Sequence, residues 1–221
     1  MKPGRKLVIF GKGNMAQLAH FYFTHDSDYE VVAFCLERDY IDLPDYLGLP
    51  VVAADDLPTI YPAADHDVYI AIGYSQMNGI RKAKFETAKE QGYTLATYVS
   101  SKSSSWGDTV FGENVFIMEN NTIMPFCTIE DNVTVWVGNI LSHHSIIGKH
   151  TTITSHVALG GDLTVGERCF LGLNSTVRNG ITLAPETMLG AGASLMHSSI
   201  AGGVYIGNPA QRVGHWHDID L

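Results

Sequence analysis

Apolar side chains recur at every sixth position over residues 111–195, and this period is the strongest pattern in the chain. A period of six fits neither an α-helix nor a simple hairpin. It fits short strands joined by tight turns, each of which sends one aliphatic side chain inward. Three such strands would close a three-sided coil, so the fifteen repeats predict five stacked coils. The fifteen positions are Phe111, Ile117, Ile123, Ile129, Val135, Leu141, Ile147, Ile153, Leu159, Val165, Leu171, Val177, Leu183, Leu189 and Leu195.

The two ends of this repeat need protection, because each coil buries the open edge of its neighbour. The segment Met196–Leu221 leaves the repeat, and we expect it to cap one end. The serine-rich run Ser100–Ser105 precedes the repeat and is typical of a junction between domains. A plain surface loop within one domain would look the same in the sequence.

The first hundred residues follow a different pattern, in which strand-like and helix-like stretches alternate. Strand, glycine turn, helix and strand in this order are typical of a parallel α/β unit. We therefore expect a small Rossmann-like domain over residues 1–100 and an all-β domain over residues 106–221. The expected strands are Lys6–Phe10, Glu30–Cys35, Val68–Ile72 and Thr94–Val99, and the expected helices are Gln17–Phe23 and Ile80–Gln91.

Composition and charge narrow the possible partners. The chain has 221 residues, of which 45% are hydrophobic, so it can bury a substantial core. A net charge of −9 argues against nucleic-acid or anionic-membrane binding, but it allows a small phosphate-bearing ligand. No run of apolar residues is long enough for a transmembrane helix. Three widely separated cysteines fit a reducing compartment, so we expect a cytoplasmic protein.

A glycine-rich turn follows the first expected strand and forms a shortened version of the dinucleotide-binding fingerprint. Glycines let the backbone approach phosphates closely, and the N-terminus of the following helix favours negative charge. Gly73 and Tyr74 follow the third strand and would line the same crevice, although all of these turns could be ordinary α/β connections. The candidate substrate-binding residues of the turn and the crevice are Gly11, Lys12, Gly13, Asn14, Met15, Gly73 and Tyr74.

These patterns together resemble a known family. The hexad repeat is similar to the left-handed parallel β-helix of bacterial acyltransferases. Combined with Gly11–Gly13, Val31–Glu37, Ala71–Gly73 and Ile206–Ala210, it resembles the nucleotide-sugar N-acyltransferases of surface-glycan pathways. Those include bacillosamine-type and perosamine-type acetyltransferases and the related sialic-acid O-acetyltransferases. The resemblance covers nearly the whole chain.

The resemblance implies a homotrimer whose leading domain binds a nucleotide-linked amino sugar, with the nucleotide's diphosphate at the glycine turn and its base near Leu36 and Glu37. It also implies acetyl-CoA, or another acyl-CoA, lying along the β-helix between neighbouring subunits. Asn14 and Met15 stand where many members have a Gly-His pair, which leaves the nucleotide undetermined among UDP, dTDP and GDP.

His143 matches the histidine base of that family, which stands four residues before the Ile-Gly of its hexad. Leu141 points inward, so His143 should lie toward the outside of the coil. An ammonium group is not a nucleophile, and a neutral imidazole can accept its proton near neutral pH. The alternative is a solvated surface histidine.

His144 departs from the family pattern, which usually has Glu or Asp at this position. Another carboxylate could balance the charge of the base, or the base could work without one. His144 could also contact the substrate or play no part.

Further residues on the repeat match family positions that contact the acyl donor. Gly161 follows His143 by one coil, and the resemblance implies that its N–H faces the thioester oxygen. A tight corner would equally require a glycine there. Leu173 and Ala191 match coenzyme-binding positions. Thr152 replaces a histidine that contacts the coenzyme in some members, whereas His156 does not align with it but could line the site.

Three functions follow from these predictions. The preferred one is transfer of an acyl group, most simply acetyl, from acyl-CoA to the amine of a nucleotide-linked sugar. The first alternative is an O-acetyltransferase for a sialic-acid-like or other hydroxyl acceptor, and the second is a non-enzymatic scaffold. A zinc site built from His143, His150 and His156 is not expected, because no histidine occurs between residues 67 and 142 to complete the usual arrangement.

Overall fold

The computed structural model describes residues 5–218 and contains two compact units. The first comprises Met1–Gly73 and Ile80–Tyr98, and the second comprises Tyr74–Gly79 and Val99–Leu221. Residues 1–4 and 219–221, which form the outer ends of the two predicted domains, lie outside the described part of the chain. The sequence did not indicate that Tyr74–Gly79 groups with the second unit. Each unit is described by itself.

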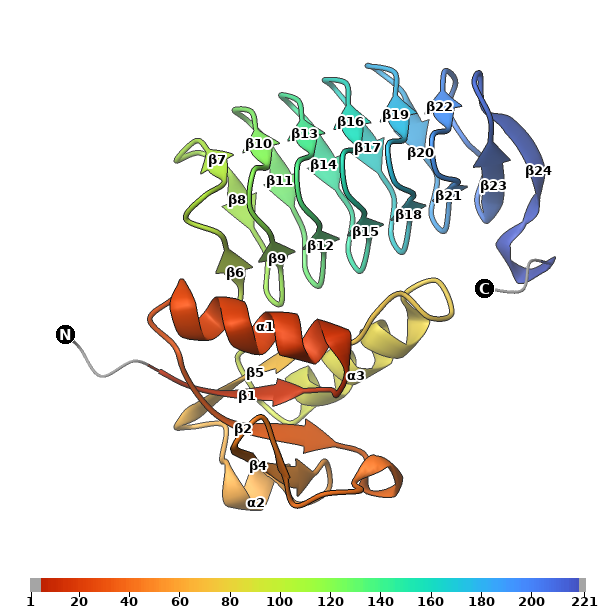
Figure 1. Cartoon of the computed structure of the whole chain (residues 1–221). Helices are drawn as coiled ribbons and strands as arrows, with labels where there is room; N and C mark the ends of the chain where they lie inside the picture. The colour runs from red at the N-terminus through yellow and green to blue at the C-terminus, as the bar shows by residue number, and fades with distance from the viewer. Residues whose placement is uncertain (1–4, 219–221) are drawn as a thin grey trace. The chain divides into compact units, whose positions relative to one another are not determined.

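The first unit is an α/β fold around a five-stranded sheet of order β3-β4-β2-β1-β5, drawn in red and orange in Figure 1. All neighbours are parallel except β3 and β4, which form an antiparallel pair. Its strands are β1 (Lys6–Phe10), β2 (Glu30–Leu36), β3 (Asp45–Tyr46), β4 (Leu49–Ala53) and β5 (His66–Ile70). Its helices are α1 (Asn14–His25), η1 (Arg38–Tyr40), α2 (Leu57–Ile60) and α3 (Gly79–Glu90).

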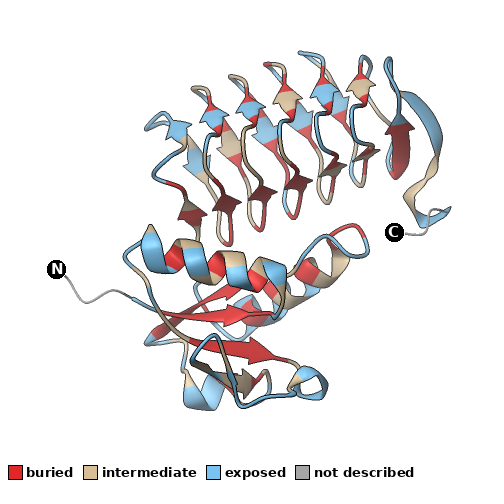
Figure 2. Cartoon of the chain, in the orientation of Figure 1, coloured by how far each residue is buried: buried red, intermediate tan, exposed pale blue. Residues whose placement is uncertain are grey.

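The apolar runs of the sequence account for the centre of this sheet. Every residue of β5 is buried, as are the last four of β1, because both faces of the sheet are covered (Figure 2). In α1, the buried residues Ala16, Ala19 and Phe23 lie three and four positions apart, which places them on one face of the helix.

The predicted strand Thr94–Val99 is wrong in extent. Only Leu95 joins the sheet, through a single bridge to Val68. The chain leaves this sheet after the bridge, and Tyr98 and Val99 already form β6 of another sheet. The Tyr98 ring packs 5.3 Å from that of Tyr22, and its hydroxyl donates to Asp26 at 2.7 Å.

The second unit is the predicted stack of hexads. Fifteen two-residue strands run from β8 to β22, and the second residue of each is one of the fifteen predicted apolar positions. The strands are β8 (Val110–Phe111), β9 (Phe116–Ile117), β10 (Thr122–Ile123), β11 (Thr128–Ile129), β12 (Thr134–Val135), β13 (Ile140–Leu141), β14 (Ile146–Ile147), β15 (Thr152–Ile153), β16 (Ala158–Leu159), β17 (Thr164–Val165), β18 (Phe170–Leu171), β19 (Thr176–Val177), β20 (Thr182–Leu183), β21 (Met188–Leu189) and β22 (Ser194–Leu195).

Strands 18 residues apart pair in parallel register, so equivalent residues of successive coils lie beside one another (Figure 1). Three sheets result, with orders β22-β19-β16-β13-β10-β7, β20-β17-β14-β11-β8 and β24-β23-β21-β18-β15-β12-β9-β6. The strands outside the fifteen are β6 (Tyr98–Val99), β7 (Ser104–Ser105), β23 (Gly203–Ile206) and β24 (Gln211–His215). Phe111 is half-buried, and the other fourteen inward side chains are at most 2% exposed. The core is therefore a continuous ladder of aliphatic side chains.

The corners between strands share one backbone conformation. Phe126, His144 and Asp162 occupy the same corner of three successive coils with φ values of 65°, 57° and 57°. This left-handed conformation costs most residues free energy, and Asn, Asp and Gly tolerate it best. The side chain at such a corner points away from the core, so it is open to selection for function.

Ser100–Ser105 is not the junction that the sequence predicted. Ser104 and Ser105 form β7, which pairs with β10, and the preceding β6 (Tyr98–Val99) continues the six-residue period toward the N-terminus. The coil therefore starts about two strands earlier than the apolar repeat. The apolar repeat did not reveal this earlier start, because Ser105 occupies a position that is aliphatic in the later hexads.

The stack ends with two longer strands. β23 (Gly203–Ile206) pairs in parallel with β21, and β24 (Gln211–His215) then turns back antiparallel to β23, before η2 (Trp216–Asp218). No helix among the described residues is long and apolar enough to cross a membrane.

Candidate active site

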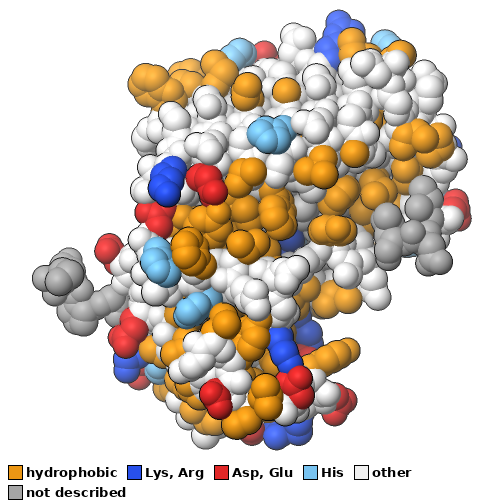
Figure 3. Space-filling view, viewed as in Figure 1, with side chains coloured by type: hydrophobic (Ala, Val, Ile, Leu, Met, Phe, Trp, Pro, Cys, Tyr) orange, Lys and Arg blue, Asp and Glu red, His pale blue; other side chains and the backbone are white. Residues whose placement is uncertain are grey.

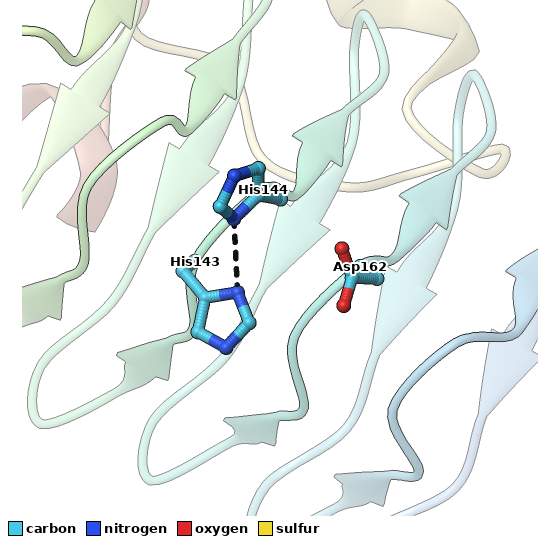
Figure 4. Close-up of side chains that lie close together, drawn as sticks. All are labelled: His143, His144 and Asp162. Atoms are coloured by element: carbon cyan, nitrogen blue, oxygen red, sulfur yellow. Dashed lines mark hydrogen bonds between the residues drawn. The ribbon is translucent and has the colours of Figure 1, made fainter.

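His143 and His144 lie in the turn between β13 and β14, on the outside of the coil (Figure 4). Their Nδ1 atoms are 3.0 Å apart, which is a hydrogen-bond distance, and their rings stand nearly perpendicular. His143 is half-buried and His144 is exposed. The predicted base therefore lies on the outside of the coil, as expected from the inward direction of Leu141, and its neighbour orients its ring.

Gly161 lies directly against the His143 ring on the next coil. A Cβ atom at this position would stand 2.6 Å from Cε1 and 2.8 Å from Nε2 of His143, so any larger residue would displace the imidazole. The N–H of Gly161 has no hydrogen-bond acceptor among residues 5–218. Gly161 thus makes room for the His143 ring and leaves one backbone donor uncommitted beside it.

Asp162 completes a cluster that the sequence did not single out. One ligand-type atom from each of His143, His144 and Asp162 lies within 4.8 Å of the other two (Figure 4). Asp162 stands 18 residues after His144 and so occupies the same corner one coil later. That spacing was the signal that could have found it, because equivalent positions of successive coils stack.

The cluster offers two imidazoles and one carboxylate, which are donor types that bind zinc. The other proposed set, His143, His150 and His156, is not brought together among the described residues. Steps of six residues place the corner residues His144, His150 and His156 at three different corners. His150 is buried and lies 2.8 Å from Asn132, whereas His156 is exposed beside Gly138.

The apolar side chain of Phe126, on the preceding coil, packs against His144. Phe126 is 63% exposed, and its ring centroid lies 4.6 Å from that of His144. Phe126 adopts the same left-handed corner conformation as His144. This contact fixes the position of the exposed imidazole.

Leu173 and Ala191, two of the predicted coenzyme-binding residues, are exposed and lie one coil apart. Thr152 is different. Its side chain is 1% exposed, and its hydroxyl donates to Oδ1 of Asn78 at 2.7 Å. The hydroxyl therefore fastens the segment Tyr74–Gly79 to the coil, so the structure gives Thr152 another role than the predicted contact with a coenzyme.

The same segment is held by two further contacts. Asn78 Nδ2 donates to the carbonyl of Cys169 at 3.2 Å, and Nε of Arg168 donates to the carbonyl of Met77 at 3.1 Å. No sequence pattern indicated this attachment, because an isolated Asn or Arg has no characteristic spacing. Tyr74 belongs to this segment, and its ring packs 4.8 Å from that of Phe170.

A separate cavity of about 800 Å³ lies within the α/β unit at the carboxyl ends of β1 and β2. It brings together five of the predicted substrate-binding residues, whereas Asn14, Met15, Gly73 and Tyr74 do not line it. Helix α1 begins beside it without a side-chain cap, so the first N–H groups of the helix are available to an anion. The five predicted lining residues are Gly11, Lys12, Gly13, Leu36 and Glu37.

The cavity also contains charged residues that no sequence pattern indicated. Lys84 from α3 pairs with Glu37, and Lys12 pairs with Asp42. The Lys12 contact lowers the pKa of the Asp42 carboxyl. Lys84 also lies 5.8 Å from the centre of the Phe10 ring. Both lysines are paired with carboxylates. An anionic ligand that binds these lysines would therefore replace Glu37 and Asp42 as their partners.

On the face drawn in Figure 3, the described Lys and Arg side chains lie in small groups, most of them beside Asp or Glu.

The inward aliphatic residues and the outward corner residues both repeat every six positions along the coil. Residues 108–143 match the family model described as bacterial transferase hexapeptide (six repeats). The curated relatives include UDP-3-O-acylglucosamine N-acyltransferase of Bordetella pertussis, which is 27% identical over 118 residues, or 52% of this chain. The chain spans about a third (32%) of the length of that relative.

Two solved structures are similar over nearly the whole chain. One is PerB from Caulobacter crescentus in complex with CoA and GDP-perosamine, with a TM-score of 0.85 and 26% identity over 95% of this chain and 97% of that one. The other is the acetyltransferase domain of PglB from Neisseria gonorrhoeae, with a TM-score of 0.84 and 21% identity over 95% and 100%. The predicted fold, an α/β unit followed by a left-handed parallel β-helix, is confirmed.

Proposed function

We propose that this chain is an acyl-CoA-dependent N-acyltransferase that acts on the amino group of a nucleotide-linked sugar. The observation that carries the proposal is the outward corner of the β-helix. There the half-buried imidazole of His143 is oriented by His144 and packed against Gly161. Similarity to a protein that binds CoA and GDP-perosamine supports the choice of substrates.

In this proposal the cavity of the α/β unit holds the nucleotide. The diphosphate lies against the glycine turn and the start of α1, where Lys12 and backbone N–H groups meet it. The base and ribose lie toward Leu36 and Glu37. The mixed charges of the cavity suit a ligand that carries both phosphates and hydrogen-bond donors.

The reaction needs one base and one oxyanion donor. Nε2 of His143 accepts a proton from the sugar amine as the amine nitrogen attacks the thioester carbonyl. The N–H of Gly161 hydrogen-bonds to the oxygen of the tetrahedral intermediate. The C–S bond then breaks, the amide remains on the sugar, and the proton on His143 passes to the CoA thiolate.

The acyl donor is acetyl-CoA or a longer acyl-CoA, and Leu173 and Ala191 offer exposed surface along its path on the coils. We propose that a homotrimer brings the coenzyme between neighbouring subunits, and that the product enters surface-glycan biosynthesis in the cytoplasm.

The test is release of CoA from acetyl-CoA with amino sugars linked to UDP, dTDP or GDP. We expect turnover with one nucleotide class, and a loss of about 10²–10⁴-fold in kcat for His143→Ala. The control is His197→Ala, which removes an exposed histidine of the tail after β22. Absence of turnover with every amino sugar, together with no effect of His143→Ala on any activity found, would contradict the proposal. Turnover with a hydroxyl acceptor alone would instead identify an O-acetyltransferase.

A further inference from the structure

Two adjacent coils place a carboxylate beside a hydrogen-bonded pair of histidines. We propose that His144 and Asp162 are positioning residues for His143: His144 fixes the tautomer and orientation of the base, and Asp162 balances the positive charge that the base acquires. This inference rests on the proposed function, in which His143 accepts the amine proton.

The contact between the two Nδ1 atoms decides which tautomer of His143 can act. At 3.0 Å, one nitrogen must donate a hydrogen and the other must accept it. If His144 donates, the proton of neutral His143 sits on Nε2 and the ring has no free lone pair. If His143 donates through Nδ1–H, its Nε2 is unprotonated and can take the proton of the amine. Only the second arrangement gives a working base, so the proposal requires His144 to accept the hydrogen bond through an unprotonated Nδ1.

His144 itself is held in place for this role. Its ring packs against Phe126 on the preceding coil, with 4.6 Å between centroids. Its Nδ1 faces His143 (Figure 4). A neutral imidazole can accept a hydrogen bond, but it cannot neutralise an imidazolium. Proton transfer to His143 would therefore leave a net positive charge on the pair.

Asp162 supplies the opposite charge. Its carboxylate lies within 4.8 Å of ring nitrogens of both histidines, a separation at which unlike charges stabilise each other. The stacked turns of this corner contain two other charged side chains. Asp108 lies two coils before His144, and its Oδ2 accepts a hydrogen bond from the N–H of Phe126, whereas the exposed Arg178 lies in the turn after β19. The thiol of Cys127, which donates to the carbonyl of Ser142, is buried, and burial raises its pKa, so it brings no charge.

The fold does not require a carboxylate at position 162. None of the described residues donates a hydrogen bond to the Asp162 side chain, and the corner conformation, with φ of 57°, is equally accessible to Asn. Gly180 occupies the same corner one coil later. An exposed Asp without a structural partner, placed beside the base, is best explained by its charge.

The experiment measures kcat and KM as functions of pH for His144→Phe, Asp162→Asn and the double variant His144→Glu/Asp162→Asn. Phe126 and Glu186 adopt the same corner conformation, so Phe and Glu fit at position 144. Asp65→Asn is the control, because it removes the same charge from an exposed residue of the α/β unit. Thermal melting confirms folding of each variant.

We expect Asp162→Asn to lower kcat roughly tenfold with KM within about twofold, and to move the acidic limb of the profile to lower pH. His144→Phe should lower kcat at least as much. The double variant should recover most of the activity, since the carboxylate introduced at position 144 would accept the Nδ1–H bond and also carry the negative charge. Asp65→Asn should match the wild type.

Two results would overturn the inference and leave the proposed function standing. The first is an inactive His143→Ala beside an Asp162→Asn variant with unchanged kcat and pH profile. The second is a stoichiometric divalent metal in the purified protein that is lost in Asp162→Asn, which would make the cluster a metal site. A fully active His143→Ala would overturn the proposed function instead.

Discussion

Gly11 in the α/β unit and Gly161 in the β-helix both stand where a Cβ atom would lie 2.6 Å from a neighbouring atom. The neighbour of Gly11 is the backbone carbonyl oxygen of Ala71, which the sheet holds in place. The neighbour of Gly161 is the imidazole of His143, a side chain that can rotate away. The first glycine is therefore required by the fold, and the second by the position of the proposed base.

The difference reflects how each unit is built. In the α/β unit the cavity forms where loops after β1 and β2 meet α3, so altering a loop alters the packing of the sheet. In the β-helix, one ladder of inward aliphatic residues holds every coil, and corner side chains such as His144 and Asp162 can change without disturbing it. A periodic core thus separates stability from function more completely than the α/β sheet does.

The largest expected effect tests that separation with two adjacent residues. Ile147 is fully buried, and Ile146 beside it is 44% exposed. Ile147→Ala should lower the free energy of unfolding by about 2–5 kcal/mol, because it leaves a cavity in the ladder. Ile146→Ala should change it by less than about 1 kcal/mol. Urea unfolding measures both, and equal losses would contradict the division into inward and outward positions.

The next effect concerns the structural glycine. Gly11→Ala should destabilise the protein by about 3 kcal/mol, because the new methyl group meets the Ala71 carbonyl and φ is 135°. A Cβ atom at Gly13 would meet no neighbouring atom within 4 Å, so only the φ of 95° disfavours alanine there. Gly13→Ala should therefore lower the free energy of unfolding by about 1 kcal/mol. The comparison uses thermal or urea unfolding. A Gly11→Ala variant as stable as the wild type would remove the contrast with Gly161.

Gly161, the proposed oxyanion donor, should behave in the opposite way. Gly161→Ala should lower kcat about 100-fold, because the imidazole must move and the oxyanion donor moves with the backbone. The melting temperature should change little. Gly107→Ala, where a Cβ atom meets nothing within 4 Å, is the matched control. Full activity in Gly161→Ala would show that His143 does not need its present position.

The smallest expected effect should be similar in the two units, because each contains a buried thiol. Burial raises the pKa of Cys35 in the α/β unit and of Cys169 in the β-helix to about 12. Above about pH 9, the ordinary range of a cysteine, the unfolded chain loses these protons while the folded chain keeps them, so stability falls as pH rises. Each thiol should cost about 1 kcal/mol at about pH 10. Urea unfolding under reducing conditions, with Cys35→Ala and Cys169→Ala variants, measures the contribution of each.

The sequence predicted the β-helix more fully than the α/β unit. All fifteen hexad positions lie where the period placed them, because every coil imposes the same requirement on its inward residue. The start of the coil was missed, since β7 has Ser105 in place of an aliphatic residue. In the α/β unit, β3 and β4 were not predicted, because β3 has only two residues and β4 is short, contains a proline and is largely half-buried.

For the candidate site, the sequence predicted those residues that belong to a motif or to a regular spacing. His143, His144 and Gly161 lie together, and the glycine turn lines a cavity with Leu36 and Glu37. Contacts between residues without characteristic spacing were not predicted. The burial of Thr152 against Asn78 and the pairing of Lys84 with Glu37 depend on how distant segments pack, which no local pattern encodes.

The most direct test of the central claim is a crystal structure with CoA and the accepted nucleotide-linked amino sugar. We expect the amino nitrogen within about 3 Å of Nε2 of His143, and the CoA sulfur beside the N–H of Gly161. A complex in which both ligands bind but the amine and the sulfur meet away from this corner would contradict the claim.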